Sequence, residues 1–306
     1  MTDKLIITGN AFGDFLVGAA VVLTPLIVKR IARLFLYPCL RKVQDKAKAP
    51  IPKLGDDSRL TVWGFSGHAE HSMYNQGIVD SSPFVARVEA YLKLLGKEYS
   101  KLRTAGLREN PRRMVPMANI YGTMVDDSSR ILDQINKHFQ TDPDSFLTPE
   151  QANMGFLIQR LLTDSLYFVV LYLNFATEPG RLMVKNFFPK DMPSAVAALV
   201  IPMVNRHQME RLQGQGIASL TEEQVCEKGK KDLEALAKIL GTNEHILGTA
   251  KPTLYDTDVY AFVAPLFYSP ATRKMGWVRE VQDKHPFFAQ YIDHMRSLLF
   301  PKDKQN

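Results

Sequence analysis

The spacing of hydrophobic residues changes along the chain, and each spacing predicts a different element. An apolar run at residues 60–65 is short and rich in β-branched and aromatic side chains, as expected of a strand. From Phe84 to Leu95 the apolar residues recur at helical spacing, which predicts a helix that ends at Gly96. Ser82 and a following proline precede this pattern, in the order favoured at a helix N-terminus.

The same patterns continue through the first half of the chain. They predict a second strand at residues 99–102, a hairpin over residues 117–125, and a helix that starts after a cap at Asp127 or Ser128. The order strand, helix, strand, hairpin and helix is that of a thioredoxin-like domain. From Pro149 onward the apolar residues follow helical spacing only. The predicted fold class is therefore α+β, with a thioredoxin-like domain at residues 58–140 and an all-helical domain at residues 148–300.

A different pattern occupies the amino-terminal segment. Residues 15–28 are almost wholly apolar and are closed by Lys29 and Arg30, and a broken apolar stretch follows. This run is at the short end for a bilayer span, which needs about 20 residues. We predict a membrane anchor with a basic flank at residues 1–45, which contacts the membrane through residues 11–40.

Three other interpretations of this segment remain open. A cleaved signal peptide would need a small-residue cleavage pattern, which does not follow the run. A mitochondrial presequence is disfavoured by the acids Asp3 and Asp14. The third is a buried helix of a soluble domain. Residues 46–57 contain two prolines and a glycine and are predicted to be a linker.

Charge is concentrated in the same amino-terminal segment. The formal net charge is +6, and the chain up to Lys48 carries eight basic residues against three acidic ones. A basic flank on one side of an anchor predicts that the folded body lies on the cytosolic side, or on the matrix side of a mitochondrial membrane. The ending at residues 302–306 matches a dilysine retrieval pattern, so the endoplasmic reticulum is the alternative to the mitochondrion. The charge pattern shows none of the spacings of a nucleic-acid-binding protein.

Three short motifs point to one ligand site. They are Ser82-Pro83-Phe84 at a helix start, Val115-Pro116 before a strand, and Asp127-Ser128-Ser129-Arg130-Ile131 at the next helix start. Their order and spacing, together with the second half of the chain, resemble the failed-axon-connections group, which is related to metaxins and to glutathione S-transferases. The resemblance covers roughly residues 60–300 and implies a thioredoxin-like domain followed by a helical domain.

Ser82 is the candidate catalytic residue. A hydroxyl at a helix N-terminus lies where free N–H groups favour negative charge, so it could stabilise a glutathione sulfur as thiolate. Ser81 takes this role if the turn is shifted by one residue. The alternative is that Ser82 only caps the helix, which stabilises it by about 1 kcal/mol.

The resemblance implies the other glutathione-binding residues. Pro116 matches a proline that is cis in this fold, and a cis bond would expose the backbone of Val115 to the peptide backbone of glutathione. Asp127 and Ser128 match an acid–serine pair that holds the γ-glutamyl end. For both pairs the alternative is local: an ordinary strand-entry proline, and a plain helix cap.

Residues 66–81 depart from this family pattern, because transferases usually have a short turn here. The loop is long enough to cover the thiol site, and it contains His68 and His71. These two histidines lack assured further ligands, so no metal site is predicted.

Two functions follow from these expectations. The first is a membrane-anchored interaction or scaffold module with little or no catalysis, an accessory subunit with protein partners or a homodimer. The second is a glutathione transferase or glutathione-dependent reductase that uses Ser82, with glutathione as its cofactor.

Overall fold

The computed structural model describes residues 58–65, 79–103, 114–184, 194–269 and 272–301. All of these lie in the second of the two units into which the chain divides, Ile51–Asn306. The predicted anchor and linker, His68 and His71, and the dilysine ending lie outside the described residues, so those expectations remain predictions.

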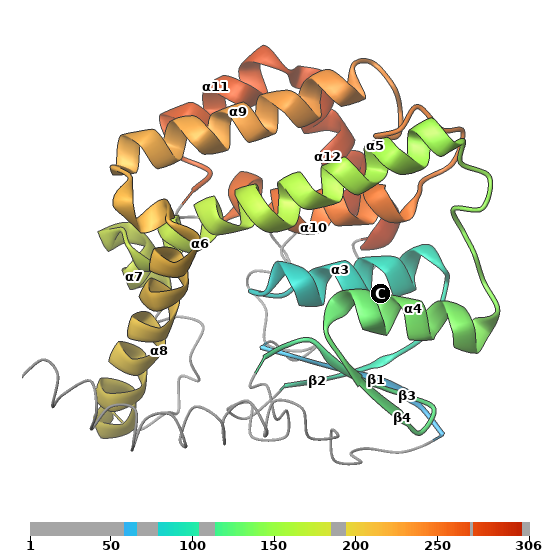
Figure 1. Ribbon diagram of the computed structural model, residues 1–306, viewed down its shortest axis with the longest axis horizontal. Helices are drawn as coiled ribbons and strands as arrows, with labels where there is room; N and C mark the ends of the chain where they lie inside the picture. Colours follow the sequence, from blue (N-terminus) through green and yellow to red (C-terminus); the bar gives the residue numbers. More distant parts are fainter. Residues whose placement is uncertain (1–57, 66–78, 104–113, 185–193, 270–271, 302–306) are drawn as a thin grey trace, which may run out of the picture. The chain divides into compact units, whose positions relative to one another are not determined.

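Four strands form one mixed sheet in the order β2-β1-β3-β4 (Figure 1). β1 pairs parallel with β2 and antiparallel with β3, and β3 pairs antiparallel with β4. A parallel pair needs a crossover connection, which α3 supplies. The ends of the strands lie within one or two residues of the predicted ones: β1 (Leu60–Gly64), β2 (Ser100–Arg103), β3 (Met117–Ile120) and β4 (Thr123–Asp126).

α3 (Pro83–Leu94) is buried on two opposite sides, between the sheet and the helical domain (Figure 1). Val85 and Val88 pack in a core formed with the sheet and α4 (Ser128–Phe139). Ala86 and Ala90 instead pack in the core of the helical domain, where their small side chains allow close approach to α10 (Leu254–Tyr268). A helix buried on both sides places its polar residues in the interior as well, where each needs a partner.

The second half of the described chain is helical, as predicted. A continuous helix from Pro149 to Phe175 contains a π-helical turn, and Phe84 of α3 packs edge-on against Tyr167 and Phe262 of this domain. The elements other than α10 are α5 (Pro149–Arg160), η3 (Leu161–Leu166), α6 (Tyr167–Phe175), α7 (Glu178–Val184), α8 (Ser194–Gln215), η5 (Ile217–Ser219), α9 (Glu222–Leu240), α11 (Gly276–Lys284) and α12 (Pro286–Leu299).

The helix from Pro149 to Phe175 is the one helix in the described part of the chain that is long and apolar enough to cross a bilayer. Length and composition alone are weak evidence, because core helices of soluble proteins meet the same test. Here Ile158, Leu162 and Leu166 are fully buried in the core of the helical domain. This burial favours a core helix over a membrane span.

Asp256 organises the start of α10. The sequence predicts that Thr253 and Asp256 form a capping box, and the Asp256 carboxylate does accept hydrogen bonds from the N–H and the hydroxyl of Thr253, both at 2.7 Å. The same buried carboxylate also accepts from the N–H of Ile246 and from the hydroxyl of Tyr291 on α12. Asp256 therefore joins α10, α12 and the connection after α9.

Candidate functional site

The three predicted motifs meet at one edge of the sheet. The register pairs Trp63 at the end of β1 with Met117 at the start of β3, and Met117 with Asp126 at the end of β4. The Val115-Pro116 motif and the helix start after Asp126 are therefore neighbours. Asp80 lies against Gly64, because a Cβ added to that glycine would come within 2.5 Å of its Oδ2. The three motifs thus come from the same end of the sheet, and the predicted cis bond between Val115 and Pro116 is confirmed.

Ser82 occupies the predicted N-cap position of α3, but its side chain does not cap the helix. Its hydroxyl makes no capping hydrogen bond to α3, whose residues are all described, and the residue is only 7% exposed. The reason lies in the backbone. Pro83 has no N–H, and the Ser82 carbonyl accepts from Val85 and Ala86, so few helix-start donors remain for a hydroxyl. The predicted side-chain cap was wrong at this residue; Ser81 beside it is half-buried.

Asp127 is an N-cap, as predicted. Its Oδ1 accepts from the N–H groups of Ser129 at 3.0 Å and Arg130 at 3.3 Å, and its backbone has a φ of 69°. Ser128 is 4% exposed, and its Oγ accepts a hydrogen bond from Nη1 of Arg87 at 3.2 Å. Asp127 is thus exposed, whereas Ser128 is buried and already hydrogen-bonded to Arg87. Glutathione binding by Val115, Pro116, Asp127 and Ser128 stays a prediction.

Arg87 is a central residue that the sequence reasoning missed. It is 2% exposed, its Nε donates to Asp258 of α10 at 2.6 Å, and its Nη1 also donates to Ser129 Oγ at 2.9 Å. Gln159 of α5 donates to the other Asp258 oxygen at 3.1 Å. One guanidinium therefore connects α3 with the start of α4 and with the helical domain. The available signal was an arginine among the apolar residues of the helical pattern.

A second buried charge cluster lies behind the start of α3, and the sequence reasoning missed it too. Lys101 of β2 donates to Glu89 at 2.6 Å and to the carbonyl of Val79 at 3.1 Å, and it lies 3.2 Å from Asp80. The Tyr99 hydroxyl donates to Glu89 at 2.9 Å. All three charged side chains are almost fully buried.

The pKa values of this cluster reflect its burial. Burial raises the pKa of Glu89 to about 7, with a smaller rise from Asp80 and an opposing effect of Lys101. Burial by itself would lower the pKa of Lys101, but Asp80 and then Glu89 outweigh it and raise that pKa. The ammonium therefore stays charged between the two acids.

Asp80 also touches the start of α3 directly. Its Oδ1 accepts the main-chain N–H of Ser82 at 2.8 Å. A carboxylate thus already occupies the neighbourhood in which a bound thiolate would need stabilisation. Of the loop at residues 66–81, only Val79, Asp80 and Ser81 are described, so whether the rest covers Ser82 stays a prediction.

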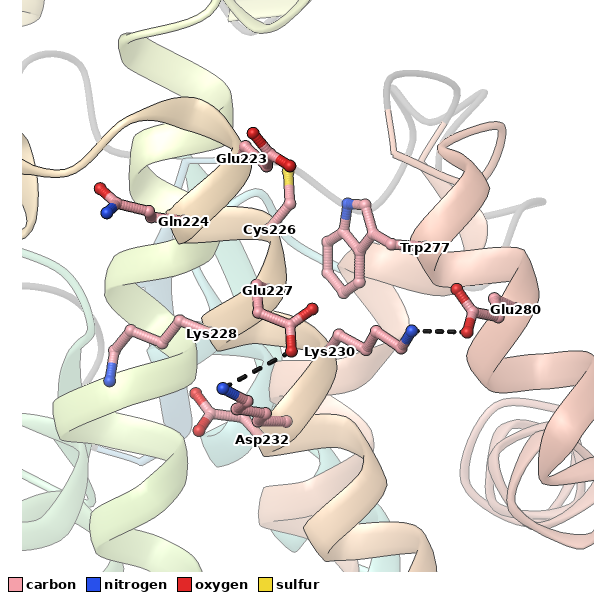
Figure 2. A pocket seen from close by; sticks show the side chains of 10 residues that line it. Glu223, Gln224, Cys226, Glu227, Lys228, Lys230, Asp232, Trp277 and Glu280 are labelled. Carbon is pink, nitrogen blue, oxygen red and sulfur yellow. Dashed lines mark hydrogen bonds and ion pairs between the residues drawn. The ribbon is translucent and has the colours of Figure 1, made fainter.

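A surface hollow of about 810 Å³ lies elsewhere, between α9 and α11 (Figure 2). Its charges are of both signs and several are paired, as in the contacts of Lys230 with Glu280 and of Lys231 with Glu227. Cys226 lines it, and burial, then the Glu222 carboxylate, raise the pKa of this thiol. A raised pKa disfavours the reactive thiolate form of Cys226.

Two family models match the chain. The glutathione S-transferase N-terminal domain matches residues 83–179, and the glutathione S-transferase C-terminal domain matches residues 229–295.

Two curated proteins are similar in sequence. Failed axon connections from Drosophila melanogaster is 21% identical over 230 residues, which cover 72% of this chain and 54% of that protein. The chain thus spans about half the length of this relative. Isoprene-epoxide--glutathione S-transferase from Rhodococcus sp. strain AD45 is 24% identical over 229 residues, which cover 72% of this chain and 93% of that protein.

Solved structures share the fold. The beta-etherase LigF from Sphingobium sp. strain SYK-6 matches with a TM-score of 0.54 at 14% identity, over 78% of this chain and 95% of that one. Glutathione transferase GSTFuA3 from Phanerochaete chrysosporium matches with a TM-score of 0.55 at 12% identity, over 79% of this chain and 98% of that one. At such identities the likeness establishes the fold alone.

Proposed function

We propose that this chain, which belongs to the glutathione S-transferase family and is similar to failed axon connections, is a membrane-held interaction module with little or no catalysis. The observation that carries the proposal is the contact of Asp80 with the main-chain N–H of Ser82 at 2.8 Å. A helix N-terminus stabilises a thiolate through its positive end. A carboxylate at the same point opposes a second negative charge.

The residues around this contact support the same conclusion. Ser82 is nearly buried, and Ser128 already accepts a hydrogen bond from Arg87, so neither hydroxyl is presented to a ligand. Asp127 directs Oδ1 to its own helix. Ser82, Ser128 and Asp127 therefore stabilise the fold. On this proposal, protein partners or a second copy of the chain bind to the outer surface.

A second function is favoured by the convergence of the three motifs at one sheet edge. On this alternative the chain is a glutathione transferase or glutathione-dependent reductase, in which Ser82 (or Ser81) stabilises the thiolate and Val115, Asp127 and Ser128 hold the peptide. The alignment with the Rhodococcus enzyme, which covers 93% of that enzyme, supports it.

Titration calorimetry with glutathione separates the two functions. We expect no saturable heat from the full-length chain in non-ionic detergent, meaning a dissociation constant weaker than about 1 mM, or about −4.1 kcal/mol. Tighter binding that Ser82→Ala and Asp127→Ala weaken at least about tenfold, a change of about 1.4 kcal/mol, would favour the enzyme. Ser219→Ala, which alters an exposed serine of the helical domain, is the matched control.

The membrane part of the proposal rests on residues 11–40 and their basic flank. We propose that they anchor the chain in a mitochondrial or endoplasmic reticulum membrane, with the folded body on the cytosolic or matrix side. In that position the chain would serve as an accessory subunit of a membrane assembly.

Alkaline extraction of membranes tests the anchor. The full-length chain should stay with the membranes, and the double variant Val21→Arg/Val22→Arg should move to the soluble fraction, since each arginine at a span centre costs about 2.5–3.5 kcal/mol. Leu157→Arg on α5, where the side chain is exposed in the other apolar helix, should not change the extraction. Loss of membrane association in Leu157→Arg alone would contradict the assignment.

A further inference from the structure

A group of three metal-ligand side chains lies in the helical domain, away from the sheet edge. Glu244 and His245 belong to the connection between α9 and α10, and His294 belongs to α12, the last described helix. Their ligand atoms all lie within 4.8 Å of one another. Figure 1 shows α9, α10 and α12 together in one part of the domain, and α12 contacts both α9 and α10. We propose that this group is a zinc site that ties α12 to the α9–α10 connection.

His245 has the environment of a metal ligand. It is 3% exposed, and its Nδ1 lies 2.9 Å from the carbonyl oxygen of Thr249. A carbonyl oxygen only accepts hydrogen bonds, so Nδ1 carries a proton, and Nε2 is the nitrogen left to bind a metal ion. Such a hydrogen bond on the far nitrogen is the usual support of a histidine that binds a metal through the other nitrogen.

The other two side chains can close on an ion with small rotations. The Nε2 of His294 lies 3.8 Å from the Oε1 of Glu244, and both side chains are substantially exposed. Ligand atoms about 2.0–2.1 Å from a tetrahedral zinc ion lie about 3.4 Å apart, so separations of up to 4.8 Å need a closure of at most about 1.4 Å. Two histidines and a carboxylate, with water as the fourth ligand, form a set that zinc accepts.

An ion pair alone explains less of this arrangement. An exposed His–Glu pair contributes at most about 1 kcal/mol and does not require the buried His245 beside it. A metal ion would use all three side chains. It would also stiffen the region in which Ile246 donates to Asp256, the acid that organises the start of α10. The sequence does not reveal such a site, because His245 and His294 are far apart along the chain.

Zinc binding to the full-length, tag-free chain tests the proposal. After treatment with a chelator, the chain is titrated with zinc chloride against a chromogenic chelator, and its melting temperature is measured with and without zinc. We expect one zinc ion per chain and a higher melting temperature, since a ligand that binds only the folded state stabilises it. His294→Ala and Glu244→Gln should each weaken the affinity at least tenfold and remove the thermal shift.

The control variant is His207→Ala, which removes an exposed histidine on α8 and should leave zinc binding unchanged. Because His294 and Glu244 are exposed, their variants are expected to fold, which circular dichroism would check. X-ray absorption of the zinc-loaded chain should show only nitrogen and oxygen ligands at about 2.0–2.2 Å. Binding that His294→Ala does not weaken, a sulfur shell at about 2.3 Å, or an absence of stoichiometric binding would each overturn the site.

Discussion

Arg87→Met is expected to lower the free energy of unfolding by about 3–5 kcal/mol. Arg87 is 3% exposed at its side chain and pairs with Asp258, which is 1% exposed. Without the guanidinium, Asp258 would be a buried carboxylate without its cationic partner. In the described part of the chain it would keep the hydrogen bond from Gln159. An uncompensated buried charge is far more costly than the loss of an exposed pair, so the expected effect is large. Urea unfolding of the full-length chain in detergent, followed by circular dichroism, measures it.

Two further variants make this prediction specific. Arg206→Met breaks an exposed pair, with side chains 84% and 57% exposed, and should change stability by at most about 1 kcal/mol. In the double variant Arg87→Met/Asp258→Leu both charges of this pair are gone, and much of the loss should be recovered. If Arg87→Met cost no more than Arg206→Met, the guanidinium would not hold the two domains together.

The elements of the thioredoxin-like domain could be predicted because their signals are local. Gly96 directly follows the α3 pattern and has a φ of 61°, a conformation that glycine adopts without strain. The Ser82-Pro83 start and the Asp127 cap were readable for the same reason, since each depends on residues next to it. The boundaries proposed for the two domains remain predictions.

The chemistry of the site could not be predicted in the same way, because its partners are distant in sequence. Arg87 and Asp258 are 171 residues apart, so no local pattern joins them. Ser82 shows the opposite limit. Its position at the N-cap was predicted correctly. However, Asp80 accepts the main-chain N–H of Ser82, and the N–H of Val85 donates to the Ser82 carbonyl and not to its hydroxyl. A motif therefore indicates where a residue lies more reliably than what its side chain binds.

Lys101→Met is the second variant with a large expected effect. Lys101 is buried between Asp80 and Glu89, and removing its ammonium leaves two acids facing each other in the interior. We expect a loss of about 3–5 kcal/mol in the free energy of unfolding near neutral pH. Lys231→Met, which breaks an exposed pair with Glu227, is the matched control and should cost at most about 1 kcal/mol.

The pH dependence of this loss distinguishes a charge effect from a packing effect. The pKa of Glu89 is raised to about 7 in the folded chain, and Lys101 opposes that rise, so the variant should raise it further. For an acid whose folded pKa lies above its unfolded one, the favourable contribution is complete below the unfolded pKa and is lost as pH rises through the folded pKa. The loss caused by Lys101→Met should therefore be larger at about pH 8 than at about pH 5.

Substitution of the acid completes the argument. In Glu89→Gln/Lys101→Met the group that titrates in this range is gone, so the difference between the two pH values should shrink. Tyr99 and Asp80 remain around the new amide. If Lys101→Met lowered the free energy of unfolding equally at both pH values, the methylene chain of the lysine, and not its charge, would be what stabilises this cluster. That outcome would also weaken the view that Asp80 presents a negative charge to Ser82, because the Lys101 ammonium forms ion pairs with both Asp80 and Glu89.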